Sequence, residues 1–205
     1  MENSSKIWLS AGEIDMLGQR DFFLTKKIII EKIYHQFAIL IEETKRQAIF
    51  INATFPEGSD SSTGKISKGE NYMGFPYQIL DFPRFFSGEN ILAIRTMVWW
   101  GNFCSCTLLL SGNSLLQHAF NLRKSFLKLK ENDFYVSVSD SPWHHHFNRE
   151  NFIAINELSE ETWIRIIDKN IFIKIARKIP IDRINELVTF SINSFRIFAA
   201  LLTSH

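Results

Sequence analysis

The amino-acid sequence predicts an α+β protein, in which an antiparallel sheet of four or five strands is covered by a long N-terminal helix and by C-terminal helices. Two β-rich runs, 91–100 and 103–110, are separated only by Gly101 and Asn102. Apolar residues between 22 and 46 recur at helical spacing, and helical patterns return after residue 158. Short links between neighbouring strands favour antiparallel pairing over a parallel sheet, so we expect the strands to lie between about 76 and 158.

Composition limits the class of protein. The 205 residues include 23 Lys and Arg and 22 Asp and Glu. The chain therefore has no overall positive charge that would attract the phosphates of a nucleic acid, and a dedicated nucleic-acid binder is not expected. No apolar run reaches the ~20 residues that a membrane span needs. The N-terminus lacks the pattern of an export signal, which predicts a cytoplasmic protein. We expect one domain over 1–205, with a small molecule or a protein as partner; the oligomeric state does not follow from the sequence.

The N-terminal part is predicted to be helical. Ser10 followed by Glu13 is a capping-box pattern, which indicates a short helix that ends at Gly18. A long amphipathic helix is predicted over 22–46. Residues 56–74 are rich in Gly and Ser and are predicted to form one long loop.

The β-rich middle contains the most specific local signal. Gly101-Asn102 between two β-rich runs predicts a type II′ hairpin. Further strands are predicted over 76–80, 134–138 and 152–158. Helices are expected over the following ranges: 115–130, 159–168, 171–178 and 181–202. On the last helices, Trp163 and Phe195 are expected to dock on the sheet.

The first candidate site lies between residues 64 and 100. Three glycines punctuate a polar stretch that leads into an aromatic strand, a composition typical of mobile lids. We therefore predict that the loop 64–74 closes over a pocket, whose ligand is held by Glu70, Tyr72, Tyr77, Asp81, Arg95 and Trp100. If Arg95 is buried in the middle of its strand, its charge must have an oppositely charged partner. A bound anion is one such partner, because the planar guanidinium group can donate two parallel hydrogen bonds to it. The alternative is that the aromatic residues are core and that Asp81 neutralises Arg95.

The second candidate site is the run SDSPWHHHF, residues 139–147, which we call the histidine segment. In an extended chain His144 and His146 point to one side and His145 to the other. Two imidazoles with a carboxylate from Asp140 or Glu150 would suit a divalent metal. The alternative is a polar loop without metal, because no helical metal motif accompanies the histidines.

The two cysteines, Cys104 and Cys106, are two residues apart on one predicted strand. Same-face neighbours along a strand are poorly placed for a mutual disulfide, so buried free thiols are expected.

Two functions of different classes remain. The first is a non-catalytic module that binds a small ligand or a protein through the aromatic, Gly-rich surface. The second is a metal-dependent hydrolase or related enzyme that uses His144 and His146, with a divalent metal as its cofactor. The first is preferred because the sequence contains no recognisable catalytic motif.

Overall fold

The computed structural model describes residues 7–203, which fall into two compact units divided between Gln36 and Phe37. The first unit contains α1 (Ala11–Leu17) and the start of α2 (Arg20–Lys45). The second contains the rest of α2 and every later element. The single domain over 1–205 stays a prediction.

The N-terminal helices form where the sequence predicts them. The Ser10 hydroxyl accepts the Glu13 backbone N–H at 3.3 Å, and the Glu13 carboxylate accepts the Ser10 N–H at 2.7 Å. These bonds confirm the capping box that begins α1. The long helix α2 begins two residues before the predicted 22–46 and ends one residue earlier.

The protein is α+β, and its sheet is antiparallel throughout, with seven strands in the order β1-β2-β3-β4-β7-β5-β6. The strands are β1 (Lys65–Tyr72), β2 (Phe75–Ser87), β3 (Asn90–Trp99), β4 (Phe103–Ser111), β5 (Tyr135–Ser137), β6 (Phe152–Ala154) and β7 (Phe172–Pro180). The prediction of four or five strands between 76 and 158 is therefore wrong in number and extent, because it lacked β1 and β7.

The prediction of a helix over 171–178 is wrong, because these residues belong to β7. This strand pairs with β4 along its whole length and with β5 at Ala176 and Ile175. The first five residues of β7 are all buried. A strand buried on both faces loses the alternation that marks a half-buried strand, so its apolar residues matched helical spacing by chance.

The central hairpin is confirmed. β3 and β4 pair antiparallel from Ile91–Ser111 to Trp99–Phe103. Its loop contains three residues, 100–102, rather than the two of a type II′ turn. The Asn102 N–H donates to the Trp99 carbonyl at 3.1 Å, and Gly101 has a φ of 69°. Glycine fits there because a side chain disfavours positive φ.

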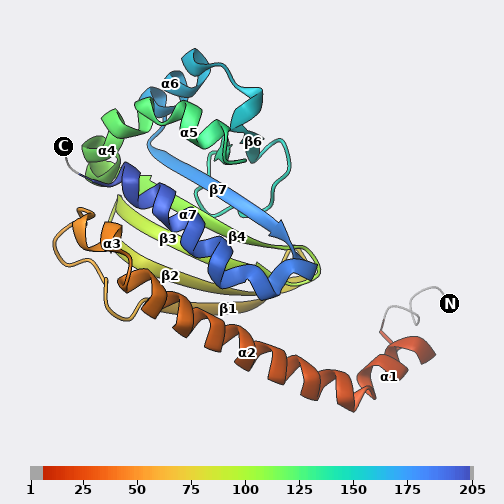
Figure 1. Ribbon diagram of the computed structural model, residues 1–205. Helices are drawn as coiled ribbons and strands as arrows, with labels where there is room; N and C mark the ends of the chain where they lie inside the picture. The colour runs from red at the N-terminus through yellow and green to blue at the C-terminus, as the bar shows by residue number, and fades with distance from the viewer. Residues whose placement is uncertain (1–6, 204–205) are drawn as a thin grey trace. The chain divides into compact units, whose positions relative to one another are not determined.

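The remaining elements are helical. They are α3 (Ala48–Asn52), α4 (Gly112–Lys124), α5 (Phe126–Lys130), η1 (Ile155–Glu157), α6 (Glu160–Lys169), η2 (Ile181–Glu186) and α7 (Leu187–Leu201). Figure 1 shows α7 lying along one face of the sheet, where the Thr96 hydroxyl meets that of Ser191 at 3.5 Å. Phe195 of α7 is 2% exposed.

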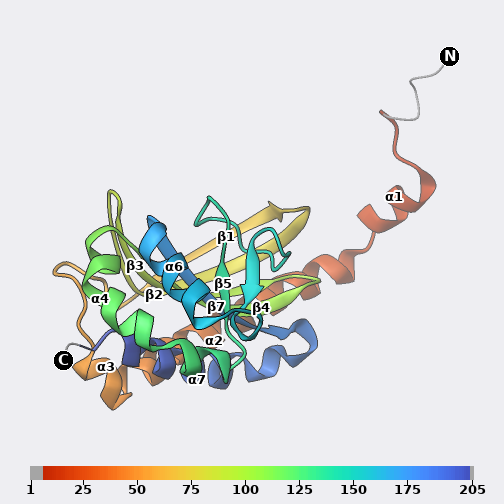
Figure 2. The same cartoon turned by 90° about the horizontal axis from the view of Figure 1, so that it is seen from above.

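Trp163 on α6 is fully buried, while its predicted docking on the sheet stays a prediction. Its indole N–H donates to the Leu122 carbonyl of α4 at 2.9 Å. The opposite face of the sheet is covered differently. Seen from above in Figure 2, the coil between β5 and β6 lies across the sheet from α7. This coil contains the histidine segment.

Candidate functional site: a buried polar cluster beneath the histidine segment

The register of the sheet brings Asp81 and Arg95 together. Asp81 on β2 is the direct antiparallel partner of Arg95 on β3, so both side chains project to the same face. Arg95 Nε donates to Asp81 Oδ1 at 2.7 Å and Nη2 donates to Oδ2 at 2.9 Å. The side chains are only 13% and 6% exposed. This bidentate pair neutralises both charges without any ligand.

His145 lies between Arg95 and a second basic residue, Lys174 of β7. Arg95 Nη1 is 3.3 Å from His145 Nε2, and Lys174 Nζ is 3.4 Å from His145 Nδ1. Lys174 also donates to two backbone carbonyls of the histidine segment, at Pro142 (2.9 Å) and at His144. The ring of Phe152 lies 5.4 Å from Nζ. One coil therefore covers these basic groups with backbone oxygens, the His145 imidazole and the Trp143 ring, whose centroid lies 5.7 Å from the guanidinium carbon of Arg95.

These contacts indicate which nitrogens carry protons. Arg95 has donors only, so His145 Nε2 must accept and the ring proton must lie on Nδ1. That N–H points at Lys174 Nζ. A neutral amine offers two N–H donors and one lone pair, which matches two carbonyls and one N–H donor; an ammonium would have a third N–H with no acceptor. We therefore assign Lys174 as a neutral amine and His145 as its Nδ1–H tautomer.

The pKa values agree with this assignment. Lys174 is 2% exposed, and burial together with the charge of Arg95 lowers its pKa from 10.5 to about 7. Burial, with Lys174 and Arg95 nearby, lowers the pKa of His145 to about 2. No carboxylate among residues 7–203 offsets the shift at Lys174. The cluster thus holds three basic groups and one acid, and above pH 7 it balances its charge because Lys174 and His145 are then mostly unprotonated.

Tyr72 at the end of β1 fixes the histidine segment in place. Its hydroxyl oxygen accepts the backbone N–H groups of His145 (2.6 Å) and His146 (3.3 Å), and it lies 2.9 Å from His146 Nδ1. Asn151 adds a hydrogen bond from its side-chain amide to the His146 carbonyl at 2.6 Å.

The side chains of His144 and His146 lie together, as the alternation of an extended chain predicts, with ring centroids 5.6 Å apart. Two N–H groups occupy the lone pairs of the Tyr72 oxygen, so its hydroxyl must donate to His146 Nδ1. This places the His146 proton on Nε2, the nitrogen that a metal would need. Glu150 is 3.9 Å from that nitrogen. In the part of the chain that the structure describes, no three His, Cys, Asp or Glu side chains form a group that could hold a metal ion.

The predicted ligand-binding residues do not all gather. Tyr72 and Tyr77 touch edge to face at 6.2 Å, on the face that carries Arg95. Trp100 instead donates to Gln78 at 2.6 Å, on the face that carries Thr96, and Trp99 is the tryptophan that contacts Tyr72. Glu70 is exposed on β1.

The prediction of a lid over 64–74 is wrong, because residues 65–72 form the edge strand β1. Gly69 serves packing rather than motion, since a side-chain carbon there would lie 2.6 Å from the Tyr77 ring. The coil that covers the polar cluster contains the histidine segment, which was predicted as a separate site.

Sequence reasoning missed Lys174 and the role of His145. The available signal was a lysine flanked by isoleucines in the run FIKIARKIP, which as a strand places the lysine among buried neighbours. Cys104 and Cys106 are buried and free, as predicted, and burial raises the pKa of each thiol to about 12.

Two open hollows flank the cluster. One, of about 400 Å³, is lined by residues of the 138–151 coil that include His144, His146 and Glu150. The other, of about 310 Å³, lies between Phe103, Phe147 and Lys178. Both are lined in part by the coil that covers Lys174, and neither is lined by Lys174 itself.

Comparison of the chain with protein-family models, with curated proteins and with solved structures gives no match. No helix within residues 7–203 has both the length and the apolar character needed to cross a membrane.

Proposed function

We propose that this protein is a non-catalytic binding module for a small carboxylate or phosphate, which is held between Arg95 and Lys174 in the space that the histidine segment fills. The observation that carries the proposal is Lys174, a buried amine with no acidic partner within the described chain. Such a group is costly to bury, and buried basic groups without a counter-charge are characteristic of functional sites.

The two carbonyl oxygens that accept from Lys174 show where ligand oxygens would lie. A carboxylate or phosphate could replace them and also accept from the free N–H groups of Arg95, whose planar fork suits both anions. Its negative charge would favour the protonated form of Lys174. Arg95, Lys174, Asp81 and a monoanion would then sum to zero charge.

A small ligand fits this cluster better than a protein surface does. Lys174 is 2% exposed and lies beneath a coil, where a flat protein surface does not reach. The covering coil has no helix or strand between Ser137 and Phe152, so its displacement breaks side-chain and single backbone hydrogen bonds rather than a ladder.

Isothermal titration calorimetry tests the proposal with a panel of small carboxylates and inorganic phosphate. At pH 8, in two buffers of different ionisation enthalpy, each bound anion should be accompanied by uptake of about one proton, because Lys174 is neutral before binding. Lys174→Met should abolish binding. Lys178→Met is the matched control, because it removes a lysine from the same face of the same strand and should leave binding intact.

Absence of binding across the panel would exclude the proposal. So would binding that Lys174→Met leaves unchanged, because the anion would then lie elsewhere.

A further inference from the structure

For its length, the N-terminal unit exposes far more large apolar side chains than the rest of the described chain. Of the 23 exposed large apolar side chains within residues 7–203, 11 lie between Ile7 and Ile29. The other 12 are spread from Ile39 to Ile171. Single proteins in water rarely expose such a concentration of apolar groups, and where they do the patch marks an interaction surface.

The apolar residues of α2 form a stripe that follows the helical repeat. Phe22, Ile29, Ile33, Phe37 and Leu40 are separated by intervals of seven, four, four and three residues, which place them on one side of the helix. Exposure along this stripe is 57% at Phe22 and 37% at Ile29, and it is 2% at Ile33 and 0% at Phe37. The first half of the stripe has the pattern of a buried face but is exposed.

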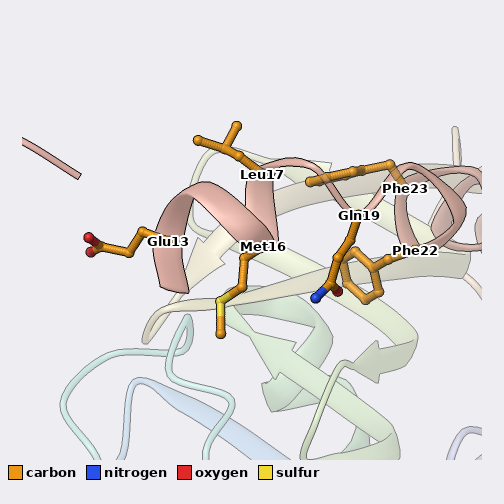
Figure 3. Close-up of a pocket in the computed structure, with 6 residues that line it drawn as sticks. All are labelled: Glu13, Met16, Leu17, Gln19, Phe22 and Phe23. Carbon is orange, nitrogen blue, oxygen red and sulfur yellow. The ribbon is translucent and has the colours of Figure 1, made fainter. Parts of the chain in front are cut away.

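The junction of α1 and α2 adds a groove to this surface. An open, mainly apolar hollow of about 440 Å³ is lined by Glu13, Met16, Leu17, Gln19, Phe22 and Phe23. Figure 3 shows Met16, Gln19 and Phe22 on one side of this junction and Leu17 and Phe23 on the other. The Phe22 and Phe23 rings lie edge to face, with their centroids 5.5 Å apart.

The charges of this unit are segregated along the chain. Between residues 7 and 22 there are three acids and one base: Glu13, Asp15, Asp21 and Arg20. Between residues 24 and 36 there are three bases and one acid: Lys26, Lys27, Lys32 and Glu31. The first half therefore has a net charge of −2 and the second half +2. Two copies aligned head to tail would match opposite charges at both ends, whereas parallel copies would match like charges.

We propose that this surface binds a second copy of the same chain, through an antiparallel pairing of the N-terminal helices about a two-fold axis near Phe23. A two-fold interface uses one patch on both subunits, so it requires the self-complementary pattern that the charges provide. A lipid surface fits less well, because amphipathic helices that bind anionic membranes carry an excess of basic residues, and here four acids balance four bases.

The first experiment is sedimentation equilibrium of the full chain over a range of concentrations. The wild type should fit a monomer–dimer equilibrium. The double variant Phe22→Ser, Phe23→Ser should raise the dissociation constant by at least about tenfold, because it removes the aromatic anchors of the interface. The matched control is Leu127→Ser, which removes an exposed apolar side chain (64%) outside the surface and should change nothing.

The second experiment tests the orientation by native mass spectrometry at low salt. Two double variants are made: one carries Asp15→Lys and Asp21→Lys, and the other carries Lys27→Glu and Lys32→Glu. Each should dissociate, because each gives residues 7–22 and residues 24–36 a net charge of the same sign. The quadruple variant that combines them restores opposite halves. It should therefore dimerise with itself but not with the wild type, which an antiparallel pairing requires and a parallel pairing does not.

A wild type that stays monomeric at all concentrations would overturn the proposal. A dimer that survives the loss of Phe22 and Phe23, or a heterodimer of the quadruple variant with the wild type, would do so as well. Binding of the unit to lipid vesicles without self-association would assign the surface to a membrane instead.

Discussion

The two faces of the central sheet come from the same strands but are covered in different ways. On one face, α7 contributes side chains, with Phe195 buried and one weak hydroxyl contact between Thr96 and Ser191. On the other, a coil contributes backbone oxygens and one imidazole to a cluster of ionisable groups. The first face depends on packing and should change little with pH. The second depends on which groups carry protons. Its stability should therefore vary with pH, and a bound ligand that changes the protonation of these groups should change it as well.

The packed face should show the largest single loss of stability. Phe195→Ala removes a buried ring and leaves a cavity, which should lower the free energy of unfolding by ~3–5 kcal/mol. Urea denaturation measures this. The loss should be the same at pH 6 and pH 9, because no ionisable side chain of the polar cluster is changed. A loss below ~1 kcal/mol would show that this face does not hold the fold together.

On the polar face, removal of one partner of the ion pair should cost somewhat less. Asp81→Leu leaves the Arg95 charge largely buried without compensation, and we expect a loss of ~3 kcal/mol. The double variant Asp81→Leu, Arg95→Met should be more stable than Asp81→Leu alone, because it removes the stranded charge. Additive losses in this double-mutant cycle would contradict the assignment of the pair as a coupled buried unit.

Lys174 should make stability rise with pH. Its pKa is about 7 in the folded protein and 10.5 when unfolded, so between these values the unfolded chain binds the extra proton. The free energy of unfolding therefore increases as pH rises through this window, and the cost of burying the amine is fully present below pH 7. Between pH 7 and 9 the increase should be ~2 kcal/mol. Lys174→Met should flatten this rise in denaturant titrations, while Lys178→Met should retain most of it.

His144 should show the smallest effect on stability, and the three histidines together decide the metal alternative. His144 is exposed, so His144→Ala should change the free energy of unfolding by ~0.5 kcal/mol or less. From the proton assigned to His146 Nε2, we expect untagged protein to purify without stoichiometric metal. Elemental analysis that finds bound metal, lost in His144→Ala and His146→Ala but kept in His145→Ala, would instead restore the enzyme hypothesis.

The features that depend only on neighbouring residues could be predicted from the sequence. The capping box at Ser10 and the hairpin around Gly101 follow from local hydrogen bonding and from the φ that glycine permits, so both were predictable. The burial of Trp163 and Phe195 follows from helical periodicity. The alternation of His144, His145 and His146 follows from extended backbone geometry.

The contacts between residues that are distant in sequence could be known only from the tertiary structure. β7 was predicted as a helix because a strand buried on both faces shows no alternation until its neighbours, β4 and β5, are known. β1 was predicted as a loop because an edge strand needs little apolar character. The polar cluster joins residues 72, 95, 145 and 174, which are distant in sequence, so no local pattern reveals it. Whether a buried lysine keeps its proton depends on its surroundings, and only the fold shows that within residues 7–203 no carboxylate offsets the fall in the pKa of Lys174.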